Sequence, residues 1–520
     1  MGDTTRRDVL RRGGASAALL TLSACAGRVV GTRDLFTLGV ASGYPGPDRL
    51  VLWTRLAPDP LADDGGGGMP DRDVQVVWEI AEDPRFERLA RRGEATAEPQ
   101  WAHSLHVEAE GLRPGRDYWY RFVADGQVSP VGHARTAPPL EVEAARLRFA
   151  HASCQHYEQG WFVAHRHMAQ EDLDLVAFLG DYIYESSWGR EHVRKHGSYP
   201  PETLAAYRVR HALYRGDPDL QACHAAHAWI VTWDDHEVEN DYAADRSERL
   251  WSRPRFLARR AAAYRAFYEH MPLPASMRPR GKDMTIHARL DWGRLARFHI
   301  LDDRQYRSHQ VCPRLGRGGS TVVGASCVER LDPALTMLGA QQEDWLDAGF
   351  ATSHARWNVI AQQTLFAPLV RGSDRDGPRF WTDGWDGYPA ARQRLVDAMV
   401  ARRLSNPLIV GGDVHACYAA DILARPAEGR GAVVASEICG TSITSQGPTQ
   451  RAIEAQLAAN PHLRYANGAE RGYVATTLSA RGASAELRVV DQVKRQDAAI
   501  RTAARFAIEA GPPGVGLAQA

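Results

Sequence analysis

Hydrophobic and polar residues alternate in the first quarter of the chain. Between about residues 36 and 136, short apolar segments such as RLVLWTRL, VQVVWEIA and DYWYRFVADG are separated by turns rich in Gly, Pro and Asp. A repeat of two residues is typical of strands with one buried face, and closely spaced short strands are typical of a β-sandwich. The pattern predicts an immunoglobulin-like β-sandwich over residues 34–137. No ligands or nucleophiles cluster in its sequence, which favours a packing or positioning role.

The pattern changes after residues 137–145, which we interpret as a linker. Six continuous apolar runs of strand length follow, at residues 146–154, 173–181, 227–235, 295–303, 356–364 and 406–414. Amphipathic stretches between them predict helices, for example at residues 161–171, 253–268 and 389–403. Strands buried on both faces that alternate with helices are typical of an α/β fold with a central sheet. We therefore expect a second, larger α/β domain over residues 146–492.

The two ends of the chain have patterns of their own. Residues 1–24 carry the pair Arg6 and Arg7 before a short apolar run, which predicts a twin-arginine signal peptide. Cys25 ends an LSAC motif and is a candidate for lipidation, with ordinary cleavage nearby as the alternative. We therefore expect export by the twin-arginine translocase to the periplasm or cell surface, and membrane contact only through such a lipid. Residues 493–520 have apolar residues at helical spacing, which predicts a helical tail.

Composition narrows the classes of function. Of the 520 residues, 44% are hydrophobic and 24% are charged, as in soluble globular proteins, so neither a disordered chain nor a multi-span membrane protein is expected. Lys+Arg and Asp+Glu are both 63, so the formal charge is zero. Such a chain has no general attraction for nucleic acid, and a charged substrate must be held by local groups. We expect a monomer without a stable nucleic-acid complex. Cys312 and Cys327 enclose a segment rich in Pro and Gly and are the best candidates for a disulfide.

Ionisable or metal-binding side chains end or directly follow five of the six apolar runs. In open α/β sheets, ligands bind beyond the carboxyl ends of the strands. The groups are Cys154, Gln155 and His156; Asp181, Tyr184 and Glu185; Asp234, Asp235, His236, Glu237 and Asn240; Asp302, Asp303 and Arg304; and Asp413 and His415. A single buried cysteine or a single Asp after a strand is usually structural. Their joint occurrence at strand ends indicates one functional site.

The donor types in these groups indicate more than one metal. Carboxylate and amide oxygens suit hard cations, imidazole suits transition metals, and thiolate or phenolate suits Fe³⁺ or Zn²⁺. Asp181 follows Gly180 and is well placed to bridge two ions with its two oxygens. Neighbouring metals are a common solution for in-line phosphoryl transfer. The sequence has no GxxxxGK[ST] loop and no GxSxG motif, which disfavours an NTPase or a serine hydrolase.

Several sequence motifs that contain these residues resemble motifs of the PhoD family of alkaline phosphatases and phospholipase D-like phosphodiesterases. The resemblance rests on LGVASGYPGPDRLVLWTRL, ASCQHYEQGWF, FLGDYIYE, TWDDHEVENDY, LDDRQYRS and GGDVHACY, and it covers roughly residues 34–490. It implies an N-terminal β-sandwich followed by a metallophosphoesterase-like domain, an α/β/β/α sandwich. It also implies similarity to purple acid phosphatases, in which a tyrosine is one ligand of Fe³⁺. The family differs from them in having a cysteine ligand and calcium, and we expect two calcium ions.

The resemblance assigns roles to individual residues. Cys154 and Tyr184 would hold iron, and Asp181 would bridge iron and calcium. Asp413 and His415 would complete the cluster.

Other assignments stay open. In TWDDHEVENDY either Asp235 or Asn240 is the matching ligand, and Asn240 is slightly favoured because a neutral oxygen suits calcium. His236 and Asp234 would support the ligands or transfer protons. Arg304 would either stabilise the phosphate oxygens or form a salt bridge with Asp302 or Asp303, and the sequence favours neither.

The main functional prediction is an exported phosphoesterase. It would hydrolyse phosphate monoesters, diesters or both at alkaline pH, by in-line attack of a metal-bound oxide or hydroxide. Alternatives are a phospholipase D-type enzyme for lipid or polymer diesters, an iron-dependent redox enzyme, and a lipid-anchored binding protein with a degenerate second domain. The intact ligand set argues against degeneracy. The segment 371–389, with Trp381 and Trp385, could wall a substrate cleft or pack its own aromatic rings.

Overall fold

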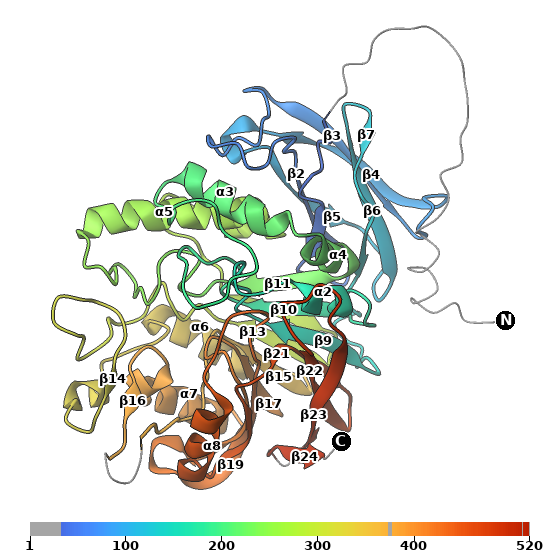
Figure 1. The fold of residues 1–520 in the computed structure, drawn as a ribbon. Helices are drawn as coiled ribbons and strands as arrows, with labels where there is room; N and C mark the ends of the chain where they lie inside the picture. The colour runs from blue at the N-terminus through green and yellow to red at the C-terminus, as the bar shows by residue number, and fades with distance from the viewer. Residues whose placement is uncertain (1–32, 373–376, 512, 519–520) are drawn as a thin grey trace, which may run out of the picture.

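The computed structural model describes residues 33–372, 377–511 and 513–518, and Figure 1 shows their arrangement. The predicted signal peptide and Cys25 lie outside these residues. Among the described helices, none is long and apolar enough to cross a membrane.

The N-terminal region is the expected β-sandwich. One layer contains β1 (Val40–Gly43), β2 (Arg49–Arg55) and β5 (Ser104–Glu110). The other is a sheet of β4 (Leu89–Ala97), β3 (Val74–Ala81), β6 (Asp117–Ala124) and β7 (Gln127–Val128), with β8 (Gly132–Arg135) paired to β6. Apolar side chains from both layers meet between them. Strand β4 had no apolar alternation in its sequence because it is largely exposed at the edge of its sheet.

The sandwich shares a sheet with the rest of the molecule. Strand β1 pairs in parallel with β11 (Ala228–Thr232). The resulting ten-stranded sheet has the order β24-β23-β22-β21-β9-β10-β11-β1-β2-β5. The strands not yet introduced are β9 (Leu147–Ala152), β10 (Leu175–Leu179), β21 (Arg471–Leu478), β22 (Gly482–Val490), β23 (Ile500–Glu509) and β24 (Gly516–Ala518). The two predicted regions are therefore joined by backbone hydrogen bonds and not only by the segment 137–145.

A second sheet lies against the first. Its seven strands have the order β12-β13-β15-β17-β19-β18-β20. Their bounds are Ala288–Trp292, Ala296–Ile300, Trp357–Ala361, Pro407–Gly411, Arg430–Cys439, Cys417–Arg425 and Leu463–Asn467 in that order. Between the two sheets, the rings of Phe149 and Phe298 meet edge to face with their centres 5.1 Å apart. The six predicted apolar runs thus form strands, three in each sheet.

Helices cover the outer faces of both sheets. The first sheet is covered by α2 (Val163–Met168), α3 (Leu204–Arg215), α4 (Pro218–Ala226) and α5 (Arg253–His270), and the second by α6 (Ala340–Ala351), α7 (Pro389–Ala401) and α8 (Gln450–Ala459). Successive residues of β17 illustrate why the runs are continuously apolar: Leu408 faces the space between the sheets and Ile409 faces the outer helices. The predicted α/β/β/α layering is confirmed.

The predicted helical tail over residues 493–520 is wrong. Ile500–Glu509 form β23, antiparallel to β22, and the sheet continues beyond the expected domain end at residue 492. Phe506 and Ile508 are buried while Arg505 and Ala507 are exposed, so the repeat is two residues. The alanines of this segment are compatible with both repeats, and pairing with the free edge of β22 decides in favour of a strand.

Candidate metal centre and active site

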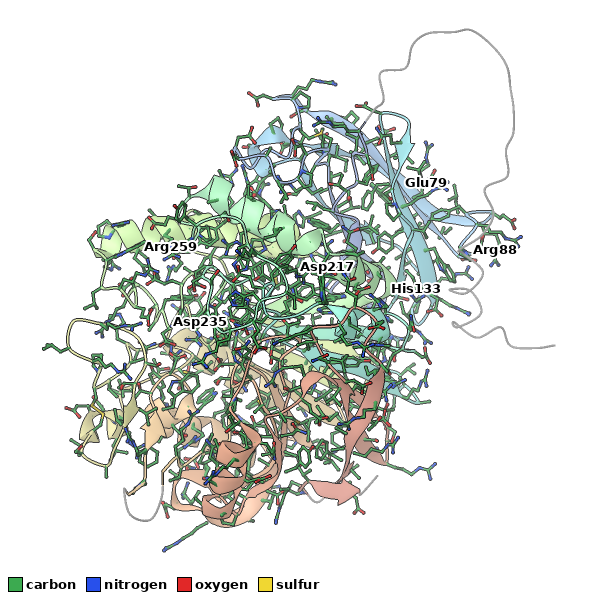
Figure 2. The ribbon with its side chains drawn as sticks, viewed as in Figure 1. Glu79, Arg88, His133, Asp217, Asp235 and Arg259 are labelled. Carbon is green, nitrogen blue, oxygen red and sulfur yellow. A yellow bond between two sulfur atoms is a disulfide. The ribbon has the colours of Figure 1, made fainter. Side chains whose placement is uncertain are left out.

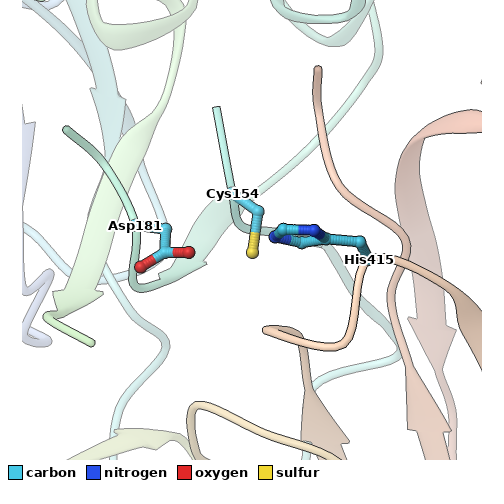
Figure 3. A group of neighbouring side chains, drawn as sticks. All are labelled: Cys154, Asp181 and His415. Carbon is cyan, nitrogen blue, oxygen red and sulfur yellow. The ribbon is translucent and has the colours of Figure 1, made fainter. Parts of the chain in front are cut away.

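The site lies where strands of the two sheets end. Cys154 follows β9, Asp181 follows β10, and Asp413 and His415 follow β17. Each has a left-handed backbone, with φ of 59°, 55°, 64° and 53° respectively. This conformation is costly for a residue with a side chain, and such outliers cluster at functional sites. Figure 3 shows the side chains of Cys154, Asp181 and His415 converging from three separate segments.

Two glycines let these strand ends approach closely. A Cβ at Gly180 would lie 2.4 Å from Cβ of Asp234, and a Cβ at Gly412 would lie 2.1 Å from Oγ of Ser153. No side chain fits at either distance. Gly180 brings the ends of β10 and β11 together, while Gly412 brings the second sheet against the end of β9 in the first. The site therefore forms between the two sheets.

Two groups of metal-binding donors share Asp181. In one, ligand atoms of Cys154, Asp181 and His415 all lie within 4.8 Å of one another; in the other, the same holds for Asp181, Asp235 and His236. The hydroxyl of Tyr184 donates to Oδ2 of Asp181 over 2.7 Å and lies 3.2 Å from Nε2 of His415. A carboxylate that belongs to a sulfur-containing and an oxygen-rich group can bridge two cations.

The buried charges of this centre require compensation. Oδ1 of Asp181 and Oδ2 of Asp413 are buried and have no hydrogen-bond partner in the described part of the chain. Burial, together with carboxylates such as Asp234 and Asp235, raises the pKa of both aspartates well above its usual value. Burial and the nearby Asp181 also raise the thiol pKa of Cys154 well above its usual value. Bound cations would reverse this and keep the ligands ionised, so the residues fit a metal centre.

Neighbouring groups fix the orientation of the candidate ligands. Nδ1 of His415 lies 2.7 Å from the carbonyl oxygen of Gln446, which places the proton on Nδ1 and leaves Nε2 free to bind a metal. The ring of Trp188 stacks parallel to that of His415, with 5.6 Å between centres. Oγ of Ser445 lies 2.7 Å from the phenol oxygen of Tyr184 and 2.8 Å from the carbonyl oxygen of Cys154.

His236 is held beside the centre by Glu185. Its Nδ1 lies 2.6 Å from Oε2 of Glu185. Burial lowers the pKa of His236, but Glu185, Asp235 and Asp181 more than offset this and raise it well above the ordinary value. Because His236 also lines the cavity of the site, it can carry a proton there.

Arg304 lies beneath the site and does not line the cavity. Its Nε pairs with Asp234, its Nη1 lies 2.8 Å from Oδ2 of Asp383, and its Nη2 lies 3.7 Å from Oδ2 of Asp235. Its ion pairs are therefore not with Asp302 or Asp303, its neighbours in the chain. A buried cation among three carboxylates neutralises part of their charge.

Asp235 and Asn240 both line the cavity. The carboxylate of Asp235 belongs to a donor group with Asp181, and its Oδ2 accepts from the backbone N–H of Asp241 over 2.6 Å. Asn240 points its amide nitrogen to Oε1 of Glu248, 3.3 Å away. Both residues are therefore within the site, five positions apart in the segment that follows β11.

Two carboxylates of the site were not expected from the sequence. Ligand oxygens of Asp235, Asp241 and Asp383 lie within 4.8 Å of one another. Asp241 belongs to the TWDDHEVENDY string but had no assigned role. Asp383 follows β16 (Phe380–Trp381), which is too short to show a strand pattern. No sequence signal of the kind used for the other residues could have found it.

The cavity above the donors has a volume of about 560 Å³. Figure 2 shows that Asp235, which lines it, lies well inside the larger domain and away from the sandwich residues Glu79 and Arg88. Of the two tryptophans in segment 371–389, Trp381 lines the cavity, whereas Trp385 is buried and donates to Oε1 of Gln362 over 3.1 Å.

Cys312 and Cys327, the pair expected from the sequence, form a disulfide. The loop between them carries Ser320, whose hydroxyl donates to Oδ2 of Asp241 over 2.6 Å. The loop is therefore attached to the carboxylates of the site.

Comparison with known proteins agrees with this geometry. The model of the PhoD-like phosphatase family matches residues 149–487, and the model of its N-terminal domain matches residues 23–138. The chain belongs to the PhoD-like phosphatase family. It is 45% identical to alkaline phosphatase D of Bacillus subtilis (strain 168), over 92% of this chain and 82% of that protein. The protein is accordingly an enzyme of the PhoD alkaline phosphatase type, which acts on phosphoric ester bonds.

Solved structures support the same family and fold. A structure of PhoD matches with a TM-score of 0.88 and 43% identity, over 93% of this chain and 92% of that chain. A purple acid phosphatase from yellow lupin (Lupinus luteus) seeds matches with a TM-score of 0.54 and 12% identity, over 91% and 73% of the two chains. At 12% identity, the second likeness shows a shared fold alone.

Proposed function

We propose that this PhoD-like enzyme is an exported, metal-dependent phosphoesterase that cleaves phosphate monoesters, diesters or both at alkaline pH. The observation that carries the proposal is the membership of Asp181 in two donor groups of different chemistry. Cys154, Tyr184 and His415 would hold Fe³⁺ with Asp181. Carboxylate or amide oxygens would hold calcium, two ions in all, from a set formed by Asp181, Asp413, Asp235, Asn240 and their neighbours.

The residues of the chain would bind the metal ions, fix the orientation of the metal ligands and supply a proton. When bound, the cations supply charge that neutralises the phosphate and acidifies a water molecule. Trp188 holds the ring of His415 and Ser445 holds the phenol of Tyr184, so these ligands keep one orientation. His236, oriented by Glu185, is a proton source for the leaving alkoxide oxygen. Arg304 supports the site from below by pairing with Asp234 and Asp383 and does not reach substrate.

One assay tests the proposed reaction. Purified protein is given an aryl phosphate and a bis-aryl phosphate at alkaline pH, with and without a calcium chelator, and its iron and calcium are counted by elemental analysis. We expect hydrolysis that the chelator abolishes and calcium restores, with one iron for each chain. Full activity in protein free of both metals would refute metal dependence. The ratio of the two rates decides between a monoesterase and a diesterase. Preference for the bis-aryl phosphate would favour the alternative of a lipid or polymer phosphodiesterase.

Export is proposed from the leader sequence. The paired Arg6 and Arg7 suit the twin-arginine translocase, and Cys25 suits lipidation. Replacing both arginines by lysine should keep the enzyme in the cytoplasm, whereas Cys25→Ala should release it from the membrane fraction without blocking export. Enzyme that reaches the cell surface with both arginines replaced would exclude that route. Size-exclusion chromatography with light scattering tests the expected monomer.

A further inference from the structure

One wall of the cavity comes from segments outside the donor groups that contain Asp181. Strand β14 (Val322–Val323) pairs antiparallel with β16, and Val322 lies opposite Trp381. Next to this ribbon, Arg371 and Arg379 are joined by two backbone hydrogen bonds of 2.8 and 2.7 Å. The side chains of Trp381 and Arg371 line the cavity. The ribbon thus presents an aromatic ring and a cation to whatever enters the site.

Hydrogen bonds fix Trp381 relative to the carboxylates. Its Nε1 donates to Oγ of Ser320 over 3.1 Å, and that hydroxyl donates to Oδ2 of Asp241 over 2.6 Å. The backbone N–H of Asp241 in turn donates to Oδ2 of Asp235 over 2.6 Å. Three consecutive hydrogen bonds therefore tie the indole to the floor of the cavity. A ring held in this way is a fixed surface and not a mobile loop side chain.

Arg371 has bonding capacity that the described residues do not satisfy. Its guanidinium carbon lies 5.3 Å from the centre of the Trp381 ring, which orients the group. Its Nε is buried and has no hydrogen-bond partner in the described part of the chain. A buried donor without a partner is costly, and an anionic ligand would supply the missing acceptor.

The charges along this side of the cavity point to the same ligand. Arg249 and Arg317 line the cavity together with Arg371. The guanidinium group of Arg317 pairs with Glu248. Within the described residues, the guanidinium groups of Arg249 and Arg371 have no carboxylate oxygen within 4.0 Å, although the backbone N–H of Arg249 donates to Oε1 of Glu239 over 3.3 Å. The metal-binding carboxylates lie on the floor, so the unpaired positive charge is on the wall. Guanidinium groups bind carboxylates and phosphates through paired hydrogen bonds.

We propose that Arg371 and Trp381 form a subsite for the alcohol portion of the substrate, and that the preferred alcohol carries a second anionic group. This inference rests on the proposed function, because the phosphate that is cleaved must occupy the metal centre. Its ester oxygen then leads away from the floor, and the cavity of about 560 Å³ leaves room for the alcohol beside the wall. The ligand class is a phosphate ester with a carboxylate or further phosphate on its alcohol. Arg371 binds that anion and Trp381 positions Arg371.

Two matched esters test the subsite in the metal-loaded enzyme. 3-Carboxyphenyl phosphate and 3-carbamoylphenyl phosphate have the same shape, and only the first carries a second negative charge. We expect the wild-type enzyme to favour the carboxylate ester by about fivefold in kcat/KM, the upper range for one partly exposed ion pair. Arg371→Gln should bring this ratio to about one. Trp381→Phe, which keeps an aromatic ring but loses the bond to Ser320, should lower it.

Controls separate the subsite from other causes. Arg379→Gln removes an exposed arginine that does not line the cavity and should keep the wild-type ratio. Thermal melting of each variant shows whether it is folded, and Arg371→Lys tests whether charge without the planar group restores part of the ratio. Equal use of both esters by the wild type, or an unchanged ratio in folded Arg371→Gln, would refute the subsite alone. If the metal-loaded enzyme cleaves neither these monoesters nor the bis-aryl phosphate, the proposed function is refuted and the subsite with it. For an enzyme that cleaves diesters alone, the same ratio is measured with the methyl diesters of the two alcohols.

Discussion

The phenol oxygen of Tyr184 lies 2.7 Å from Oδ2 of Asp181, three positions earlier in the chain. The same oxygen lies 3.2 Å from Nε2 of His415, which follows a strand of the opposite sheet. One hydroxyl therefore connects donors from both sheets. Any rearrangement of the sheets relative to each other would therefore disrupt the centre.

Tyr184→Phe tests this connection. The variant keeps the ring, whose centre lies 4.1 Å from that of His236, and removes only the oxygen. We expect kcat/KM for an aryl phosphate to fall by about 100-fold or more, as for the loss of groups that bind or orient a metal. If the phenolate binds Fe³⁺, the visible absorbance of the pure protein should disappear as well. Tyr418→Phe is the control, since its hydroxyl bonds to Gln456, outside the donor groups. Equal activity of both variants would contradict the role of Tyr184.

Asp181→Asn should separate metal binding from folding. In wild-type protein, bound metal stabilises the folded state, so a chelator should lower the melting temperature. The variant keeps the shape of the side chain but loses a negative charge from a buried group of carboxylates. We expect it to lose metal and activity, to show no chelator effect, and to melt no lower than chelated wild type. A marked chelator effect in the variant would mean that Asp181 is not needed for metal binding.

Arg304→Met should act mainly on stability. Arg304 is the buried counter-ion of Asp234 and Asp383, and its removal leaves uncompensated buried charge. We expect the free energy of unfolding to fall by about 3–5 kcal/mol. Arg402→Gln breaks an exposed pair with Asp347, which solvent screens, and should leave the free energy of unfolding nearly unchanged. Chemical denaturation of both variants makes the comparison. Normal stability with lost turnover would instead place Arg304 in contact with substrate.

The shared sheet predicts that the catalytic region does not fold well alone. A protein that starts at residue 138 lacks β1 and exposes the edge of β11, which invites aggregation. It also loses the hydrogen bond from Nε1 of Trp53 to the carbonyl oxygen of Glu269, 3.1 Å long and buried. We expect an insoluble or aggregated product by size-exclusion chromatography. Co-expression of residues 34–137 as a separate chain should rescue solubility, and a monodisperse, active truncated protein would contradict the prediction.

Much of the fold was predictable from local patterns. Strands such as Leu175–Leu179 are apolar throughout because both of their faces are buried, and this holds in either sheet. The pattern did not reveal which sheet each run joins, since three lie in one and three in the other. The tail was mistaken for a helix because its alanines fit both repeats, and the free edge of β22 is a property of the folded chain.

The site divides in the same way. Cys154, Asp181, Tyr184, Asp413 and His415 were candidates because donors that follow buried strands collect at one edge of a sheet, and the structure brings these residues together. Asp383 follows a two-residue strand and could not be found by that rule. The same rule could not predict the ion-pair partners of Arg304, because Asp234 and Asp383 are distant from it in the chain.

The sequence by itself determined the strands, the layered class of fold and most of the donors, because these depend on which residues are buried and on which side chains come directly after each strand. Only the tertiary structure decided that Asp383 joins Asp235 and Asp241, that Arg304 is a buried counter-ion, and that Arg371 and Trp381 wall the cavity. These features depend on distances between segments that the chain brings together only when the two sheets pack.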